Sequence, residues 1–126
     1  MKLNKIILSF VSALVILFST SVASFAKVVG DKIILGAAIS LTGKYSSNGV
    51  HTQNGYNMAV DRINSMGGVK VGGKTYKFDI IYYDDESNPK RAAQLAERLI
   101  SQDKVEFMLG PYSSGCLLYT SPSPRD

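Results

Sequence analysis

The chain has 126 residues, a formal net charge of +4, 45% hydrophobic residues, 19% charged residues, one cysteine and no tryptophan. This length suits a single modest domain, and the apolar content supports a buried core, which excludes disordered and collagen-like classes. Beyond residue 26 the net charge is only +2, so the composition gives no electrostatic footprint for nucleic acid. The lone Cys116 excludes an internal disulfide framework and a zinc site built from several thiolates.

Residues 1–26 have the layout of a secretory signal peptide. Lys2 and Lys5 precede an apolar run from Ile6 to Phe18, and the segment ends in Ser24-Phe25-Ala26. Cleavage there would place the mature protein in the periplasm or outside the cell. An uncleaved membrane anchor is the alternative, because no charge interrupts the apolar part.

A buried strand and an amphipathic helix are predicted next. The run from Ile33 to Ile39 is almost continuously apolar, as in a strand covered on both faces. A helix should follow, with polar residues 46–48 as its cap and Gly67-Gly68 as its end. Its inner face is predicted to carry Val50, Met58, Ala59, Ile63 and Met66.

A small hairpin and a second strand–helix–strand unit follow. Residues 69–78 form two short extended pieces around Gly72-Gly73, and the second piece continues into a longer strand. Asn88 and Pro89 supply the cap and first residue of a second helix. Residues 105–109 form the third strand. The apolar face of the second helix is predicted to consist of Ala92, Ala93, Leu95, Ala96, Leu99 and Ile100.

The order strand, helix, strand, helix, strand predicts an α/β fold with a doubly wound parallel sheet between helices. In such sheets small ligands bind where the strands end at their carboxyl edge. Here these ends are the loops at residues 40–48, 84–88 and 111–115. The sequence therefore predicts a ligand site built from these three loops.

Residues 116–126 are predicted to be a non-native or disordered tail. The third strand of such a fold calls for another helix, but Pro122 and Pro124 disfavour one. The tail resembles translated sequencing-adaptor read-through, and a flexible native C-terminus is the alternative. In either case Cys116 is not expected to be functional.

Several loop motifs occur in a fixed order along the chain. They are Leu35 to Tyr45, Gly55 to Asn64, Gly67-Gly68-Val69, Tyr83 to Pro89 and Leu109 to Gly115. This series resembles the opening part of the branched-chain amino acid (Leu/Ile/Val) binding proteins of ABC transporters. The resemblance implies the type I periplasmic binding protein fold, in which two doubly wound lobes close on a ligand. It further implies an N-terminal fragment, with residues 27–115 as a partial first lobe.

The resemblance also implies which residues contact the ligand. In the family, the serine that matches Ser114 holds the carboxylate of the bound amino acid, and Ser113 and Gly115 complete its loop. A hydroxyl and free N–H groups where a strand meets a helix suit an anion. Tyr45 and Asn48 belong to the first loop, which borders the ligand. Some members have a tyrosine where this chain has Asn48, which leaves the ligand's identity open, and a plain polar turn is the alternative for residues 113–115.

The implied function is that of the extracytoplasmic solute-binding component of an ABC importer. Its ligand would be an amino acid of the branched-chain type or a related small carboxylate, and its partners would be permease subunits in the inner membrane. Neither catalysis nor a cofactor, metal or nucleic acid is expected. A ligand-sensing domain of a membrane receptor and an enzyme on a doubly wound scaffold are the alternatives.

Two polar features are predicted to have no chemical role. The acidic run from Asp84 to Glu86 is expected to face solvent near the positive end of the following helix, although clustered carboxylates also suit a metal ion. His51 is expected to be a solvated residue on the first helix.

Ser114 is not expected to be a catalytic nucleophile, because it does not lie in the G-x-S-x-G motif of a nucleophilic serine.

Overall fold

The computed structural model describes residues 27–120, so the predicted signal peptide at residues 1–26 lies outside the described part. Its elements are β1 (Val28–Val29), β2 (Lys32–Ile39), α2 (Ser46–Ser65), β3 (Val69–Val71), β4 (Lys74–Asp84), α3 (Pro89–Ser101), β5 (Phe107–Leu109) and α4 (Ser114–Thr120). Within residues 27–120, no helix has the length and apolar character needed to cross a bilayer.

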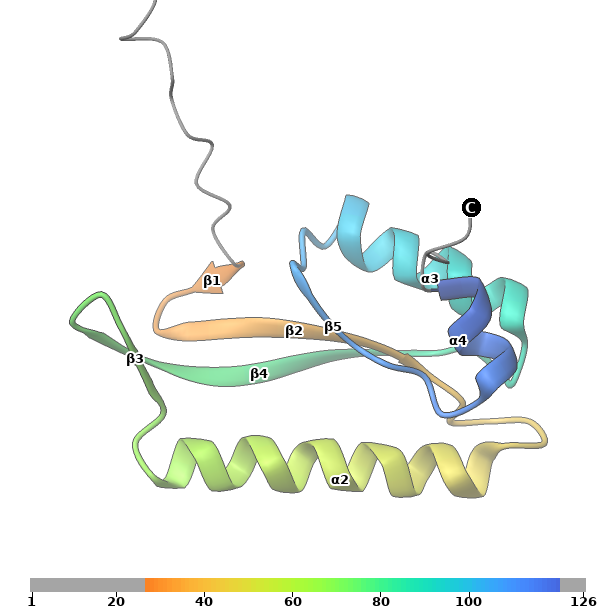
Figure 1. Ribbon diagram of the computed structural model, residues 1–126, viewed down its shortest axis with the longest axis horizontal. Helices are drawn as coiled ribbons and strands as arrows, with labels where there is room; N and C mark the ends of the chain where they lie inside the picture. Colours follow the sequence, from red (N-terminus) through yellow and green to blue (C-terminus); the bar gives the residue numbers. More distant parts are fainter. Residues whose placement is uncertain (1–26, 121–126) are drawn as a thin grey trace, which may run out of the picture.

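Strand β2 lies at the centre of a mostly parallel sheet (Figure 1). It pairs with β4 from Lys32–Lys77 to Ile39–Asp84, and its other edge pairs with β5 at residues 35–37. The short β1 is antiparallel to the beginning of β2, and β3 forms the predicted hairpin with β4. Helix α2 covers one face of the sheet, and α3 and α4 cover the other. The predicted doubly wound α/β architecture is confirmed.

The core lies between the sheet and α3. Its buried members are Ile34, Ala38, Leu99 and Val105, with Ile81, Tyr83, Leu95 and Met108 packed around them. Gly36 permits this packing, because a Cβ there would lie 3.0 Å from a Val105 methyl carbon and 3.2 Å from one of Leu99. Helix α3 begins as predicted, with the Asn88 side chain accepting hydrogen bonds from the backbone N–H groups of Lys90 and Arg91.

The predicted inner face of α2 is largely wrong. Met58 and Met66 are 72% and 67% exposed, and Val50 and Ala59 are also exposed, whereas Ile63 is half-buried as predicted. The buried residue of α2 is Gly49, where a Cβ would lie only 1.7 Å from the carbonyl oxygen of Ser40, directly after β2. This contact, together with the hydrogen bonds of Asn57 to Tyr82 and of Asn64 to Phe78, holds the helix in an orientation that leaves most of its predicted apolar face exposed.

The two ends of α2 differ in how well they follow the prediction. The cap residue is Tyr45, and no side chain caps the helix, so the polar residues 46–48 do not act as predicted. The other end stops as expected at Gly67 and Gly68, which have φ values of 99° and 86°. These left-handed values favour glycine over any residue with a side chain.

Helix α4 contradicts the prediction that no helix follows Gly115. Residues 114–120 are helical, and Cys116 is fully buried against the rest of the fold. Pro122 and Pro124 come after Thr120, the last residue of α4 that the structure describes, so they do not prevent this helix. Disorder is therefore the wrong description for residues 116–120, while residues 121–126 lie outside the described part.

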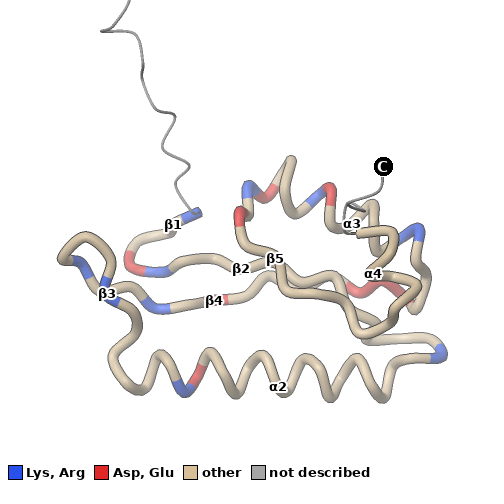
Figure 2. The backbone as a smooth tube through the Cα atoms, in the orientation of Figure 1, with Lys and Arg blue, Asp and Glu red and all other residues tan. Residues whose placement is uncertain are grey.

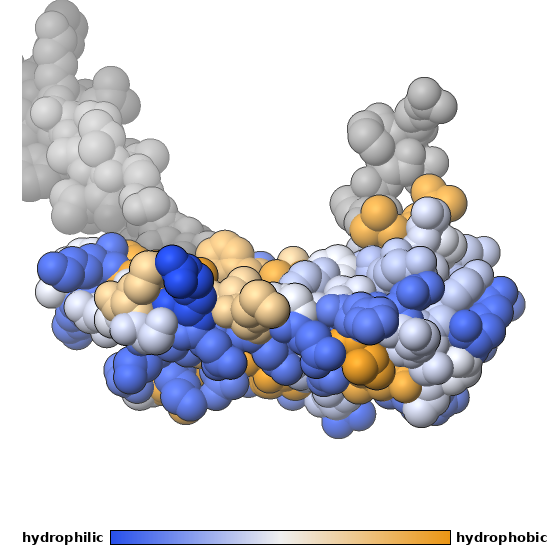
Figure 3. All heavy atoms as spheres, turned by 90° about the horizontal axis from the view of Figure 1, so that it is seen from below, coloured by the Kyte–Doolittle hydropathy of each residue, from blue (hydrophilic) through white to orange (hydrophobic). Residues whose placement is uncertain are grey.

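Charged residues of both signs are spread along α3, and lysines lie near the β3–β4 hairpin (Figure 2). Acidic residues also lie where β4 ends, close to α4. The surface on the α2 side is mainly hydrophilic with separate apolar patches (Figure 3). His51 is exposed on α2, as predicted.

Candidate ligand-binding site

Three loops meet at the carboxyl edge of the sheet. The first loop (residues 40–45) follows β2, the second loop (residues 85–88) follows β4, and the third loop (residues 110–113) follows β5. Parallel pairing of β2 with both other strands brings the three strand ends together. The strand order therefore brings the three predicted loops to one edge of the sheet.

The first and third loops make direct side-chain contact. Asn48, on the first turn of α2, donates from Nδ2 to the Tyr112 hydroxyl at 2.9 Å. The rings of Tyr45 and Tyr112 are tilted against each other with centroids 6.2 Å apart, a favourable aromatic pair. Lys44 places its ammonium 4.6 Å from the centre of the Tyr45 ring. Tyr45 and Asn48 therefore form one wall with Tyr112.

Residues 113–115 lie at the start of α4, directly after this wall. The Ser113 hydroxyl accepts a hydrogen bond from the Cys116 backbone N–H at 3.1 Å, as a helix cap does. Ser114 and Gly115 are exposed to solvent. The first backbone N–H groups of a helix have no partner within the helix, so they are available to an acceptor.

Burial raises the pKa of the Cys116 thiol, which keeps it protonated.

Asp85 does not face solvent, contrary to the prediction for the acidic run. It is fully buried, and its Oδ1 accepts from the Ser40 hydroxyl at 2.6 Å and from the Ser87 backbone N–H at 2.8 Å. Glu86 is exposed and forms a 3.2 Å ion pair with Arg91. Within residues 27–120, no group of three or more His, Cys, Asp and Glu side chains is arranged to hold a metal ion.

Asp84 binds both neighbouring loops. Its Oδ1 accepts from the backbone N–H groups of Leu41, Thr42 and Glu86 at 2.9, 3.1 and 2.9 Å. Its Oδ2 accepts from the Thr42 hydroxyl at 2.7 Å. Partial burial raises the pKa of Asp84, but these hydrogen bonds outweigh it and the pKa lies below its usual value. The carboxylate is therefore ionised at neutral pH.

Two tyrosines at this edge were not predicted. Tyr112 completes the wall with Tyr45 and Asn48, and the Tyr56 hydroxyl donates to the Gly110 carbonyl at 2.8 Å, which ties α2 to the third loop. Burial raises the pKa of Tyr56, so the hydroxyl remains a donor. Tyr112 could have been predicted from the sequence, because it directly precedes the predicted serines. For Tyr56 the only signal in the sequence is its position two helical turns after Asn48, which places both residues on the same face of the helix.

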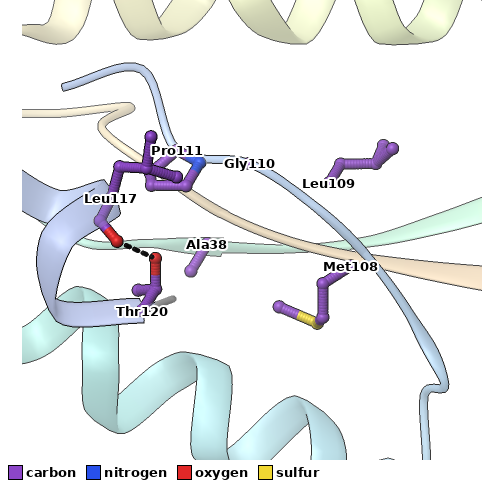
Figure 4. A pocket seen from close by; sticks show the side chains of 7 residues that line it. All are labelled: Ala38, Met108, Leu109, Gly110, Pro111, Leu117 and Thr120. Atoms are coloured by element: carbon purple, nitrogen blue, oxygen red, sulfur yellow. Dashed lines mark hydrogen bonds between the residues drawn. The ribbon is translucent and has the colours of Figure 1, made fainter. Parts of the chain in front are cut away.

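A cavity of about 110 Å³ lies beside the start of the third loop, between β2, β5 and α4 (Figure 4). Its lining residues are Ala38, Met108, Leu109, Gly110, Pro111, Leu117 and Thr120. The Thr120 hydroxyl donates to the Leu117 carbonyl at 3.3 Å on its α4 side. The cavity is lined mainly by apolar side chains and includes none of the five predicted contact residues. It therefore lacks the groups that would bind a carboxylate.

The strand order and the helices on both faces of the sheet define a doubly wound α/β protein, with three loops gathered at the carboxyl edge of the sheet. A family model described as a periplasmic binding protein matches residues 32–122. The chain belongs to this family. The match continues beyond Gly115 into the segment that was predicted to be a non-native tail.

Individual relatives agree with the family match. The chain is 34% identical over 107 residues to the Leu/Ile/Val-binding protein BraC3 of Rhizobium johnstonii, covering 83% of this chain and 28% of that protein. It is similar in structure to the branched-chain amino acid binding protein LivJ of Streptococcus pneumoniae in complex with isoleucine, with a TM-score of 0.63 and 30% identity over 71% of this chain and 24% of that one.

A third similar structure holds another kind of ligand. It is a solute-binding protein of an ABC transporter from Rhodopseudomonas palustris in complex with 3,4-dihydroxybenzoic acid. The TM-score is 0.58 and the identity 29%, covering 73% of this chain and 24% of that one. The chain spans about a quarter of the length of the curated relatives it matches. Its residues correspond to part of the first lobe of the fold.

Proposed function

We propose that the protein is the extracytoplasmic solute-binding component of an ABC importer for amino acids or related small carboxylates. The observation that carries this proposal is the meeting of three loops at the carboxyl edge of the sheet, within a chain of the periplasmic binding protein family. The contact of Tyr45 and Asn48 with Tyr112 joins the first and third loops at that edge.

The shared chemistry of the relatives' ligands supports a carboxylate as the recognised group. LivJ holds isoleucine, and the Rhodopseudomonas protein holds 3,4-dihydroxybenzoic acid. These molecules differ in side group and charge, but each carries a carboxylate. A site that recognises this group first would accept either class, and the neighbouring wall would then select the remainder of the ligand.

Ser114 is proposed to bind the carboxylate. Ser114 and Gly115 are exposed residues at the start of α4, where the Ser114 hydroxyl and the first backbone N–H groups of the helix are the donors proposed to bind it. The Ser113 hydroxyl caps the helix and so holds this segment in place. Tyr45, at the end of the first loop, and Asn48, on the first turn of α2, would border the ligand. No covalent chemistry and no cofactor are required.

Binding would be completed by hinge closure of a second lobe, and the closed form would be recognised by the permease. This proposal places the protein in the periplasm or outside the cell. Residues 1–26 would act as the signal peptide that directs export. The proposal also requires further chain to form the second lobe. In the experiments below, the full-length protein is the polypeptide that includes this second lobe.

The proposal is tested by calorimetric titration of the full-length protein with leucine, isoleucine, valine and benzoate. At least one ligand should bind, and Ser114→Ala should weaken its binding by about tenfold or more, since one hydrogen bond to a charged group contributes roughly 1.5 to 3 kcal/mol. Ser101→Ala is the matched control, because Ser101 is exposed at the far end of α3. Binding of none of the four ligands would contradict the proposed ligand class.

A further inference from the structure

The first loop is held in place by the end of β4. The backbone N–H groups of Leu41 and Thr42 donate hydrogen bonds to one oxygen of the Asp84 carboxylate, and the Thr42 hydroxyl donates to the other. The same carboxylate accepts from the Glu86 backbone N–H in the second loop. One ionised carboxylate therefore holds the first and second loops together, although they are more than 40 residues apart in sequence.

Ser87 extends this connection toward Tyr45. Its hydroxyl donates to the Thr42 carbonyl at 2.7 Å and accepts from the Tyr45 backbone N–H at 3.0 Å. Gly43 lies so close that a Cβ there would be 2.7 Å from both the Glu86 carbonyl oxygen and the Ser87 hydroxyl oxygen. The position of the Tyr45 backbone thus depends on the shape of the second loop.

The second loop holds an unfavourable backbone conformation. Glu86 and Ser87 have φ values of 53° and 61°, a left-handed region that residues with a side chain rarely adopt. Their N–H groups are accepted by Asp84 and Asp85, respectively. Because such conformations persist only where the surroundings enforce them, loss of a carboxylate should release the second loop, and with it the first.

We propose that Asp84 is a positioning residue of the ligand site: through Leu41, Thr42 and the second loop, it fixes the first loop, which carries Tyr45 and leads into the first turn of α2 with Asn48. This inference rests on the proposed function. Asp84 acts indirectly and does not contact the ligand, because its oxygens accept hydrogen bonds from donors of the two loops. A negative charge would also repel a ligand carboxylate that approached it directly.

The test compares Asp84→Ala and Asp84→Asn with Asp61→Asn in the full-length protein. Asp61→Asn removes one carboxylate charge, as the Asp84 variants do. Because Asp61 is exposed on α2 and lies outside this network, its substitution breaks none of the loop contacts. Thermal unfolding gives the stability of each variant, and calorimetry gives the affinity for the tightest ligand of the four-member panel and the ratio of affinities between two ligands. Amide hydrogen exchange follows Leu41, Thr42 and Tyr45 directly.

Asp84→Ala should weaken binding by about tenfold or more, change the affinity ratio, and speed exchange at these three amides. Asp84→Asn should have a smaller effect, because its remaining carbonyl oxygen still accepts N–H groups, and Asp61→Asn should have none. A lower melting temperature in the Asp84 variants with unchanged affinity, ratio and exchange would overturn the inference. Asp84→Asn provides the decision if Asp84→Ala does not fold.

The two proposals can fail separately. If the wild-type protein binds none of the four ligands, the proposed ligand class fails, and exchange in the ligand-free protein decides on Asp84. Faster exchange at Leu41, Thr42 and Tyr45 in Asp84→Asn would then support its control of the first loop. Exchange equal to that of Asp61→Asn would overturn it.

Discussion

Gly49 is the position where the backbone of α2 comes into close contact with Ser40, the residue directly after β2. A Cβ at this position would lie 1.7 Å from the Ser40 carbonyl oxygen, whereas a Cβ at Gly55 on the same helix would have no atom within 4 Å. The two glycines therefore differ in their role. Gly49 permits a close backbone contact, while Gly55 only lowers the helix propensity of the chain.

We predict opposite effects for alanine at these two positions. Gly49→Ala should lower the free energy of unfolding by about 1 to 3 kcal/mol, because the helix must move away from Ser40. Gly55→Ala should raise it by about 0.5 to 1 kcal/mol, because it favours the helix without a clash. Urea unfolding of the full-length protein measures both, and a stabilising Gly49→Ala would contradict the described contact.

At the residue scale, sequence located the edge loops better than it predicted the contacts between side chains. Tyr45 and Asn48 were identified through family resemblance, but their partner Tyr112 is 64 residues from Asn48. The burial of Asp85 likewise depends on Ser40, 45 residues away. Pairs this distant leave no local spacing pattern, so the acidic run looked like a solvated helix start.

The elements were predicted where a local signal determines them. Asn88 and Pro89 mark the start of α3, and Gly72 and Gly73 form the turn between β3 and β4. The buried face of α2 was mispredicted, because the Gly49–Ser40 backbone contact and the hydrogen bonds of Asn57 and Asn64 to β4 leave no apolar pattern in the sequence. Helix α4 was missed because the prolines that follow it were taken to exclude any helix after Gly115.

Helix α3 offers a matched test of its buried face. Leu99 is fully buried in the core, whereas its neighbour Ile100, also predicted to face inward, is 56% exposed. Leu99→Ala should lower the free energy of unfolding by about 2 to 5 kcal/mol through lost burial and an internal cavity. Ile100→Ala should cost well under half as much. Chemical denaturation of the full-length protein compares them, and equal losses would contradict the orientation of α3.

At the scale of the whole molecule, the described residues leave apolar surface uncovered. Phe107 on β5 is 54% exposed, and Leu118 and Tyr119 on α4 are 80% and 60% exposed. β5 pairs with β2 along one edge over three residues. Exposed apolar side chains beside a short strand favour association with other chains.

A polypeptide limited to residues 27–126 should therefore unfold without a sharp transition and should associate as its concentration rises. Scanning calorimetry and sedimentation velocity test this expectation, with the full-length protein as the reference. A monomer with a cooperative thermal transition would show that the partial lobe is a stable unit by itself. Ligand binding by this polypeptide would contradict the requirement for a second lobe.

The central claim is that the edge loops of this chain bind a small carboxylate through Ser114. The most direct measurement is a crystal structure of the full-length protein with the ligand that binds most tightly in the calorimetric panel. The ligand carboxylate should lie about 2.5 to 3.2 Å from the Ser114 hydroxyl or from the backbone N–H groups beside it, with Tyr45 and Asn48 bordering the ligand. A carboxylate bound elsewhere, with residues 113–115 facing only solvent, would contradict the account.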